Sequence, residues 1–220
     1  AVHWIESDVA SQGAVEREVA TALEGIGVTT RSFSSDLLVK PESLRNKEGR
    51  GLRVFTPFWK RVLSLGDPPR PLPVPKPLKA GPTVASDDLA SWHLEPERPD
   101  WAGGLRETWT PGEASAQARL KDFLDHDVAG YATSRDRPDR DETSRLSPHL
   151  RFGEISPRQI WHASNFAAAR KPAIASDVGK FLSELGWREF SRHLLFDLPQ
   201  LAEQNLQPSF DAFPWKQDAK

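Results

Sequence analysis

The sequence predicts a chain in two structural parts, an α/β segment followed by an all-helical region, with a long proline-rich linker between them. Residues 1–63 alternate between strand-like and helix-like patterns, which is typical of an α/β layer. Residues 64–112 hold ten of the nineteen prolines. From residue 113 onward, apolar residues recur at helical spacing behind capping motifs, which predicts a group of helices.

The α/β segment is expected to contain three strands and two helices. Short apolar or β-branched runs predict the strands, and apolar residues three and four positions apart predict the helices. Val2, Trp4 and Ile5 give the first strand the composition of a buried one. The chain has no Met and begins inside this strand, so we expect it to be a piece of a longer protein. The expected strands are VHWI (2–5), GVTTRSF (27–33) and DLLVK (36–40), and the expected helices span 13–27 and 54–63.

The linker contains the alternating run PRPLPVPKP. Prolines in alternation force an extended backbone and exclude helix, so we expect residues 64–112 to run over the surface of the two parts. Trp92, Trp101 and Trp109 predict that aromatic contacts hold part of the linker in place.

Three hydroxyl–proline motifs predict helix starts in the second part. Thr110-Pro-Gly-Glu113 and Ser156-Pro-Arg-Gln159 have the form of a capping box, in which the hydroxyl and the third side chain satisfy unpaired amides reciprocally. Ser147-Pro148 predicts another start by the same logic. The last long helix is expected over residues 177–197, and its core stripe is expected at Val178, Phe181, Leu182 and Leu185.

Composition excludes several classes of function. The net charge of −2 gives no general basic field, so any contact with nucleic acid requires a local patch. The absence of Cys excludes disulfides and cysteine nucleophiles, and the six His show no metal-ligand spacing, so no metal site is expected. No apolar run approaches the ~20 residues of a membrane span, and the first residues lack the plan of a signal peptide. We therefore expect a soluble, cytoplasmic protein.

The segment TSRLS, residues 143–147, places three hydroxyls around Arg145 before a predicted helix start. The first amides of a helix are unpaired and carry the positive end of its dipole, so they can hold a phosphate together with such hydroxyls. The alternative is that Ser147 only caps the helix while Thr143 and Ser144 belong to a loop. Local sequence favours this simpler alternative, because single Ser caps are common.

The stretch SELGWREFSRHLL places Glu184, Trp187 and Arg188 off the core stripe of the last helix. A Trp beside a carboxylate and a guanidinium can receive a flat ligand by stacking. Phe190 and Leu194 extend the apolar surface around the helix, so Trp187 can equally be buried against a second neighbour. Glu184 and Arg188 can then form only an i,i+4 ion pair.

The stretch GYATSRDRPDRDETSRLS alternates arginines with acidic residues. This pattern is typical of a solvated loop, in which the charges pair with one another or with water. Beside a phosphate site, the same arginines can instead contact a nucleic-acid backbone.

Taken together and in this order, these segments resemble the DNA photolyase/cryptochrome family. VFTPFWKRV is similar to the helix that closes the family's N-terminal α/β domain. TPGEASAQARLKDFL, GYATSRDRPD, TSRLSPHLRFGEISPRQIWHA and FLSELGWREFSRHLL are similar to consecutive parts of its helical flavin domain. The resemblance covers nearly the whole chain and is to class I cyclobutane pyrimidine dimer photolyases of bacterial type.

The resemblance implies a domain for each part of the chain. Residues 1–63 would be the C-terminal part of an incomplete Rossmann-like α/β (antenna) domain, and 64–112 the interdomain linker. Residues 113–220 would be the N-terminal half of an all-α FAD-binding domain. Residues 11–18 preserve no recognisable antenna motif of the family, so the identity of any second, antenna chromophore stays open.

The resemblance also implies a FAD site, which favours the phosphate interpretation of TSRLS. Glu184 and Trp187 match the family's substrate pair, in which the Trp stacks on the flipped-out pyrimidine dimer and the Glu donates to or accepts from it. Arg135 matches an Arg that contacts DNA. The residues that match FAD contacts are Tyr131, Thr143, Ser144, Arg145, Leu146, Ser147, Phe181 and Arg188.

The implied activity is that of a deoxyribodipyrimidine photolyase, a carbon–carbon lyase of DNA repair. In this family, reduced FAD absorbs blue light and donates an electron to a cyclobutane pyrimidine dimer, whose ring then splits. We further expect Glu184, desolvated beside Trp187, to stay protonated and to donate a hydrogen bond to the dimer.

Two alternatives use the same FAD site. One is a cryptochrome-type blue-light photoreceptor without repair activity, and the other is a (6-4) photolyase. The Glu184–Trp187 pair favours repair, since a receptor has no need of a Trp that stacks on a dimer. We expect the 220-residue piece alone to lack a complete active site, to bind FAD weakly or not at all, and to be inactive.

Overall fold

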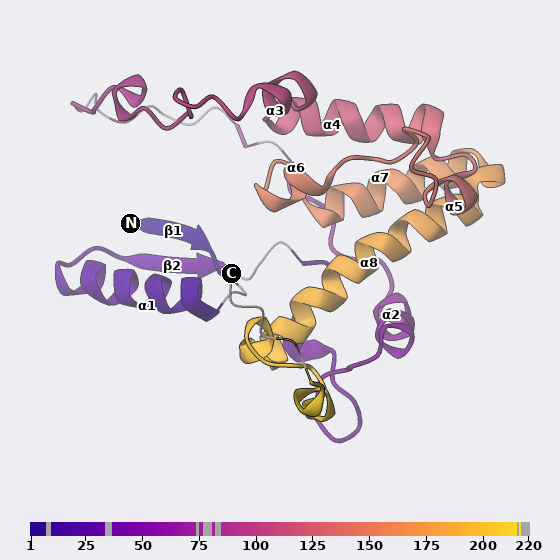
Figure 1. The fold of residues 1–220 in the computed structure, drawn as a ribbon, viewed down its shortest axis with the longest axis horizontal. Helices are drawn as coiled ribbons and strands as arrows, with labels where there is room; N and C mark the ends of the chain where they lie inside the picture. Colours follow the sequence, from indigo (N-terminus) through magenta and orange to yellow (C-terminus); the bar gives the residue numbers. More distant parts are fainter. Residues whose placement is uncertain are drawn as a thin grey trace.

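The chain folds into a small parallel sheet with one helix, followed by a group of packed helices (Figure 1). The computed structural model describes residues 1–7, 10–33, 37–73, 75–76, 81, 85–214 and 216. The order of strands before helices agrees with the α/β segment and the all-helical region that the sequence predicts.

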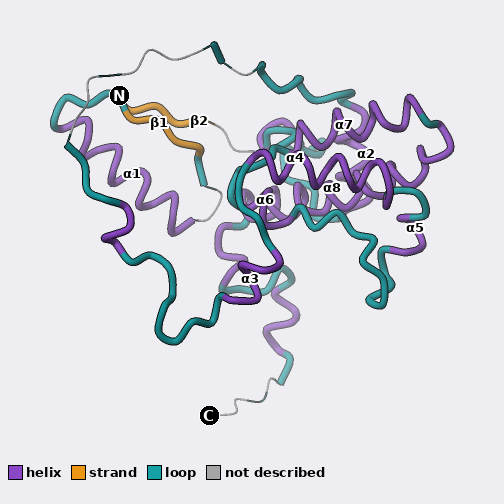
Figure 2. Tube along the Cα trace, turned by 90° about the horizontal axis from the view of Figure 1, so that it is seen from above, coloured by secondary structure: helices purple, strands orange, loops and turns teal. Residues whose placement is uncertain are grey.

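Strands β1 (Val2–Ile5) and β2 (Thr30–Phe33) pair in parallel, with Val2 opposite Thr30 and Ile5 opposite Phe33. Helix α1 (Ala10–Gly25) lies between them in the chain and beside them in space (Figure 2). The strand and helix assignments are confirmed, but the burial expected for the first strand is wrong. Val2 is 39% exposed and Ile5 is 61% exposed, because a two-stranded sheet with a single helix leaves much of both strands uncovered.

The expected strand DLLVK is also wrong within its described residues, 37–40; Asp36 lies outside them. Leu37 and Leu38 are buried, but their backbone belongs to no sheet. Two buried side chains of the last long helix bind this backbone instead. Glu189 accepts from the Leu38 amide at 2.7 Å, and His193 Nε2 lies 3.1 Å from the Val39 carbonyl.

The helical region is built around one long helix, α8, which packs against α2, α5 and α7. The last helix was predicted from residue 177, and α8 begins two residues earlier. The short helix predicted at 54–63 is α2. The α-helices of this region are α2 (Phe55–Ser64), α3 (Gly103–Thr108), α4 (Glu113–Asp122), α5 (Tyr131–Ser134), α6 (Ser147–Arg151), α7 (Pro157–Arg170) and α8 (Ala175–Asp197).

Shorter turns complete the chain. A π-helical turn (Phe123–Asp127) follows α4 directly. The 3-10 helices are Pro41–Ser43, Leu89–Trp92, Pro172–Ile174, Pro199–Ala202 and Pro208–Ala212.

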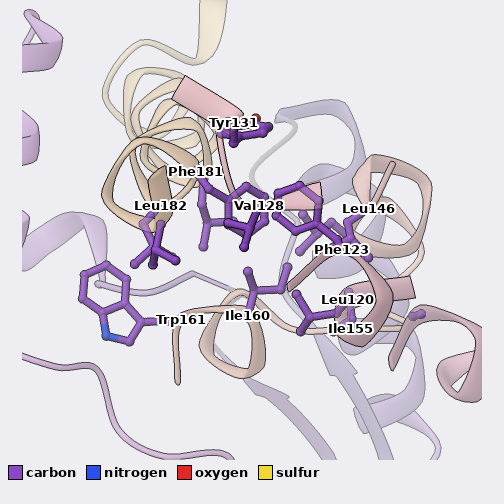
Figure 3. Packing of buried hydrophobic residues seen from close by; sticks show 14 of the residues in the cluster. Leu120, Phe123, Val128, Tyr131, Leu146, Ile155, Ile160, Trp161, Phe181 and Leu182 are labelled. Carbon is purple, nitrogen blue, oxygen red and sulfur yellow. The ribbon is translucent and has the colours of Figure 1, made fainter. Parts of the chain in front are cut away.

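The main hydrophobic core joins α4, the π-helical turn, α7 and α8 (Figure 3). The predicted core stripe of the last helix is confirmed, since its four residues are each 6% exposed or less. Phe123 and Phe181 pack with ring centroids 4.7 Å apart near the centre of this core. A second cluster joins α2 to α8 through Phe58, Val62 and Phe190. The two clusters fix α8 from two sides.

The alternating run PRPLPVPKP is not helical in its described residues, as predicted, but the expected linker 64–112 also contains the 3-10 helix Leu89–Trp92 and helix α3. The first residues of the linker are bound by α7, because Trp161 Nε1 donates to Asp67 at 2.9 Å and His162 Nε2 lies 2.9 Å from the Pro68 carbonyl. Of the three tryptophans expected to hold the linker, only Trp109 meets the expectation, by packing perpendicular to a His ring. Trp92 and Trp101 are 56% and 69% exposed.

One of the three predicted caps is confirmed. Ser156 accepts from the Gln159 amide at 3.2 Å, and the Gln159 side chain accepts from the Ser156 amide at 2.8 Å, which completes the capping box of α7. The other two predictions are wrong. Helix α4 has Gly112 as its N-cap, and α6 has Leu146, and neither makes a side-chain cap bond.

Candidate functional site

A cavity of about 520 Å³ lies between α5, the segment before α6, α7 and α8. Three separate segments bring the expected FAD contacts to it, and Glu184 of the expected substrate pair lies beside them. The lining residues are Tyr131, Thr143, Ser144, Arg145, Leu146, Ser147, Leu150, Arg151, Ile160, Phe181, Glu184, Leu185, Arg188 and Arg192. A larger cavity of about 720 Å³ lies between α4 and α7, and none of the predicted site residues lines it.

The segment TSRLS enters this cavity in an unusual backbone conformation. Arg145 has a φ of 49°, in the left-handed region that a side chain with a Cβ rarely adopts. Leu146 next to it is 2% exposed and anchors the segment in the core. Within the described part of the chain, the hydroxyls of Thr143, Ser144 and Ser147 make no hydrogen bond, so they are available to a ligand. Ser147 is therefore not the helix cap that local sequence favoured.

The cavity is cationic. Four guanidinium groups line it, from Arg145, Arg151, Arg188 and Arg192, against the single carboxylate of Glu184. Among the described contacts, Arg145 pairs with Asp141 at 2.7 Å and Arg188 pairs with Glu189 at 3.1 Å, both acids lying outside the lining. This excess of positive charge, next to free hydroxyls, suits a ligand with phosphate groups.

The expected i,i+4 pair between Glu184 and Arg188 is absent from the described contacts. Glu184 instead pairs with Arg135 of the loop after α5 and with Lys180 one turn earlier on α8, the latter at 3.0 Å. The ion pair raises the pKa of Arg135 above its ordinary value, against the opposing effect of burial. Glu184 thus lies against two cationic side chains, and its expected role as a hydrogen-bond donor to the dimer stays a prediction.

Aromatic and apolar side chains form the inner wall. Tyr131 and Phe181 are 7% and 6% exposed, and their rings lie 5.7 Å apart and perpendicular. Burial raises the pKa of Tyr131, so this phenol stays neutral and its ring stays apolar at physiological pH. Asp177 at the start of α8 accepts from the amides of Gly130 and Ala132 at 3.0 and 2.9 Å, which fixes Tyr131 against α8.

Trp187 lies one turn beyond Glu184 but outside the cavity lining. Its indole stacks on Phe55 of α2, with ring centroids 3.7 Å apart and planes 7° apart, and it is 45% exposed. Both interpretations of Trp187, as a buried residue and as a surface for stacking, therefore agree in part with the structure. Trp187 has a second apolar neighbour, and it also presents surface on which a flat ligand can stack.

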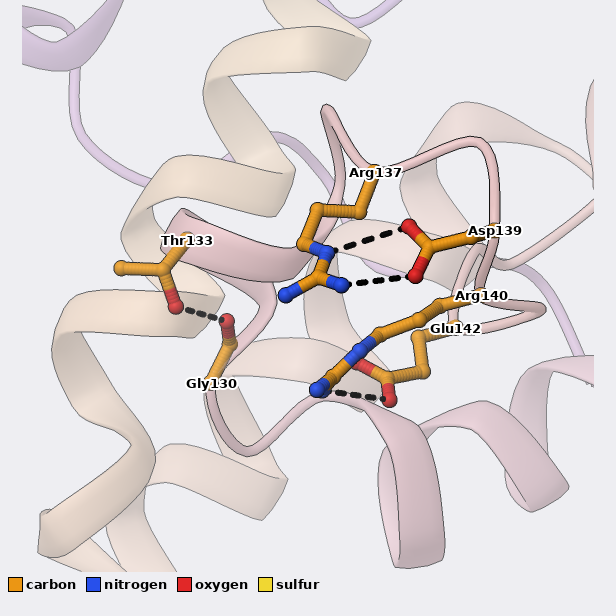
Figure 4. Close-up of polar contacts among 6 residues, drawn as sticks. All are labelled: Gly130, Thr133, Arg137, Asp139, Arg140 and Glu142. Atoms are coloured by element: carbon orange, nitrogen blue, oxygen red, sulfur yellow. Dashed lines mark hydrogen bonds and ion pairs between the residues drawn. The ribbon is translucent and has the colours of Figure 1, made fainter.

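The arginine-rich loop after α5 pairs with its own acids (Figure 4). Arg137 makes two hydrogen bonds to Asp139, at 3.1 and 2.6 Å, and Arg140 lies 3.3 Å from Glu142. Arg137 has a side chain that is 52% exposed. These contacts agree with the solvated-loop interpretation for Arg137 and Arg140, whereas Arg135 points to Glu184 at the site.

Sequence reasoning missed five residues of the lining. Arg151 and Arg192 are the important ones, because they contribute half of its guanidinium groups. Helical spacing could have found both, since Arg151 lies four positions after Ser147 and Arg192 four positions after Arg188. The other three, Leu150, Ile160 and Leu185, are core residues whose edges reach the cavity.

The described residues form neither a metal centre nor a membrane-spanning helix. They contain no group of three or more His, Asp or Glu side chains placed to hold a metal ion. None of their helices has both the length and the apolar character to cross a membrane.

Comparison with known proteins gives the family of the chain. Residues 1–77 match the family model described as DNA photolyase, and residues 181–220 match the model described as FAD binding domain of DNA photolyase. The deoxyribodipyrimidine photo-lyase of Agrobacterium fabrum is 43% identical over 209 residues, which cover 94% of this chain and 43% of that protein. Cryptochrome-1 of Arabidopsis thaliana is 33% identical over 204 residues, covering 87% of this chain and 29% of that protein.

A solved structure extends the similarity to the fold. The structure of a bacterial class III photolyase from Agrobacterium tumefaciens superposes with a TM-score of 0.80 at 41% identity, covering 99% of this chain and 45% of that one. This relative is a class III photolyase, whereas the sequence motifs resemble class I enzymes. The chain spans less than half the length of these relatives. The fold and the flavin-domain match define a protein of the photolyase type. The chain belongs to the DNA photolyase/cryptochrome family.

Proposed function

We propose that the protein is a FAD-dependent photolyase that repairs cyclobutane pyrimidine dimers in DNA. The observation that carries this proposal is the cavity beside α8, which gathers all eight expected FAD contacts from three separate segments. The proposal includes the domain boundaries 1–63, 64–112 and 113–220, a cytoplasmic location and a second chromophore of open identity.

The residues of the cavity fit FAD in two ways. Its hydroxyls and four arginines suit the diphosphate, because guanidinium groups bind phosphate oxygens through charge-assisted hydrogen bonds. Tyr131 and Phe181 give the apolar, aromatic wall that a flat ring system requires. Thr143, Ser144 and Ser147 would hold the phosphates, and Arg188 would sit between the phosphates and the substrate side.

When bound and reduced, FAD supplies the light-driven electron that splits the cyclobutane ring. The protein binds the lesion and holds it in place. Flipping a nucleotide out of a duplex costs a few kcal/mol, and least for a damaged base. Trp187 would stack on the flipped dimer, and Arg135 would exchange its ion pair with Glu184 for a contact with DNA. Glu184 would then keep Lys180 as its partner while it accepts or donates a hydrogen bond at the dimer.

Cryptochrome relatives share the fold, so a photoreceptor without repair activity is the second candidate. The Glu184–Trp187 pair supports repair over signalling. A (6-4) photolyase would use the same FAD site on a different lesion. Repair assays with each lesion separate these three functions.

The FAD site is tested by Ser147→Ala, with Ser156→Ala as its matched control. Both serines precede a proline, but only Ser147 lines the cavity, and Ser156 only caps α7. Losing one hydrogen bond to a charged phosphate costs about 1.5–3 kcal/mol, so we expect FAD to bind roughly 10- to 150-fold more weakly to Ser147→Ala. Flavin titration followed by fluorescence measures this in the full-length protein. Equal FAD affinities in the two variants would contradict the assigned site.

The reaction is tested by blue-light repair of a thymine-dimer oligonucleotide in the full-length protein. We expect repair in light only, and loss of lesion binding in Trp187→Ala. Glu184→Gln and Glu184→Ala separate the roles of that side chain, because only Gln keeps a hydrogen bond to the dimer. FAD binding without repair of either lesion would favour the photoreceptor.

A further inference from the structure

The contact between α2 and α8 places two aromatic rings one turn apart on α2. Phe55 and Trp59 lie with ring planes 10° apart and centroids 6.3 Å apart. The six-membered ring of Trp59 rests against Gly186, where an added Cβ would lie 2.6–2.9 Å from three ring atoms. Glycine at position 186 therefore allows α2 to approach α8 closely enough for the next contact.

That contact is between Phe55 and Trp187, the residue after Gly186. The two rings are nearly parallel at 3.7 Å, and Phe190 lies roughly perpendicular to both, with centroids 5.9 Å away from each. One face of the indole is thus covered and a third ring limits its rotation. Trp187 is still 45% exposed, and because Phe55 covers one face of the indole, a ligand that stacks on it must use the opposite face.

An indole on the surface of a helix normally samples several rotamers, and a ligand that stacks on it must first restrict them. Ordering one such side chain weakens binding by a factor of about two to ten. Here the stack on Phe55 orders the ring before any ligand arrives. A flipped base would then extend an existing stack of Trp59, Phe55 and Trp187.

We propose that Phe55 is a positioning residue for the lesion, acting by holding the Trp187 indole ready to stack. This inference rests on the proposed function, in which Trp187 receives the flipped dimer. It assigns part of lesion recognition to α2, a helix that contributes nothing to the lining of the FAD cavity.

The test compares Phe55→Leu with Phe55→Tyr in the full-length, FAD-loaded protein. Leu keeps the apolar volume and loses the ring, whereas Tyr keeps the ring and should restore binding. Phe166→Leu is the matched control, because Phe166 is 63% exposed on α7 and lines the other cavity. We expect Phe55→Leu to bind a thymine-dimer oligonucleotide about fivefold more weakly, with unchanged flavin absorbance and unchanged repair yield per bound lesion.

A second measurement does not depend on DNA. The near-UV circular dichroism of Trp187 is obtained as the difference between each protein and the same protein carrying Trp187→Phe. This signal should be lost in Phe55→Leu and kept in Phe55→Tyr and in the control. The positioning role is overturned if Phe55→Leu leaves either the Trp187 signal or the lesion affinity unchanged. It is also overturned if Phe55→Tyr does not restore what Phe55→Leu loses. If Trp187→Ala leaves lesion binding intact, the proposed function fails at this residue, while the dichroism still reports whether Phe55 orders the ring.

Discussion

Gly186→Ala tests the close approach of α2 and α8 by adding a single methyl group. In the interior of a helix, Ala is favoured over Gly by about 1 kcal/mol. At this position the new Cβ would lie 2.6–2.9 Å from the Trp59 ring, closer than carbon atoms pack. Overpacking of this kind costs about 1–3 kcal/mol, so the net effect should be a loss of up to about 2 kcal/mol in the free energy of unfolding.

Gly179→Ala on the same helix isolates the steric contribution. Gly179 is exposed and has nothing within 4 Å of an added Cβ, so this variant should gain up to about 1 kcal/mol. Urea unfolding followed by far-UV circular dichroism gives both values under identical conditions. The difference between the two variants should be about 1–3 kcal/mol. If Gly186→Ala is as stable as Gly179→Ala, then α2 does not rest against α8 in solution.

Three further predictions concern the site and its surroundings. Ser156→Ala should lower the free energy of unfolding by about 1 kcal/mol through loss of the α7 cap, measured by urea unfolding. Arg145→Gly should be more stable than Arg145→Ala by about 1 kcal/mol, because only glycine adopts a φ of 49° without strain. Equal stabilities of the two variants would contradict the left-handed backbone. Both variants should bind FAD more weakly than the parent in a flavin titration. A hydrogen bond from His149 at 2.5 Å holds the pKa of Glu154 below its ordinary value of 4.5. A carboxyl whose pKa is lowered by folding stabilises the folded state at pH values above its unfolded pKa. This stabilisation is lost as the pH falls through the pKa of the folded state. Glu154→Gln should therefore flatten the dependence of the urea midpoint on pH below 4.5.

Local signals predicted the α7 cap correctly and placed the starts of α4 and α6 to within two residues, but the cap residues of these two helices were predicted wrongly. Ser156 succeeds because both halves of its capping box lie within four residues. At α4, Gly112 takes the cap with a φ of 113° that only glycine tolerates. At α6, Leu146 takes the cap, because its burial in the core fixes where the helix begins. Local chemistry could not anticipate a boundary set by tertiary packing.

The site shows the same limit for contacts between distant segments. Nine of the fourteen residues that line the cavity were predicted from family motifs, and the structure brings them together. The ion pair between Arg135 and Glu184 was not predicted, because the two residues are 49 positions apart in the sequence and no spacing rule joins them. The strand expected at DLLVK failed for a related reason. Its apolar residues Leu37 and Leu38 are buried, but Glu189 and His193 supply the hydrogen bonds that a sheet would otherwise give.

One helix, α8, therefore connects the parts of the molecule that the proposed function needs. Its core stripe fixes it against α7, while Glu184 and Arg188 face the cavity. On a third side Glu189 binds the Leu38 amide through one carboxylate oxygen and Arg188 through the other. A buried carboxylate that is 1% exposed must keep such partners, since an unpaired charge in the interior is strongly unfavourable. Glu189 therefore links the segment that follows the sheet to the Arg188 guanidinium at the cavity. A substitution at residues 37–39 should shift Arg188 and so change the affinity of the proposed site for FAD.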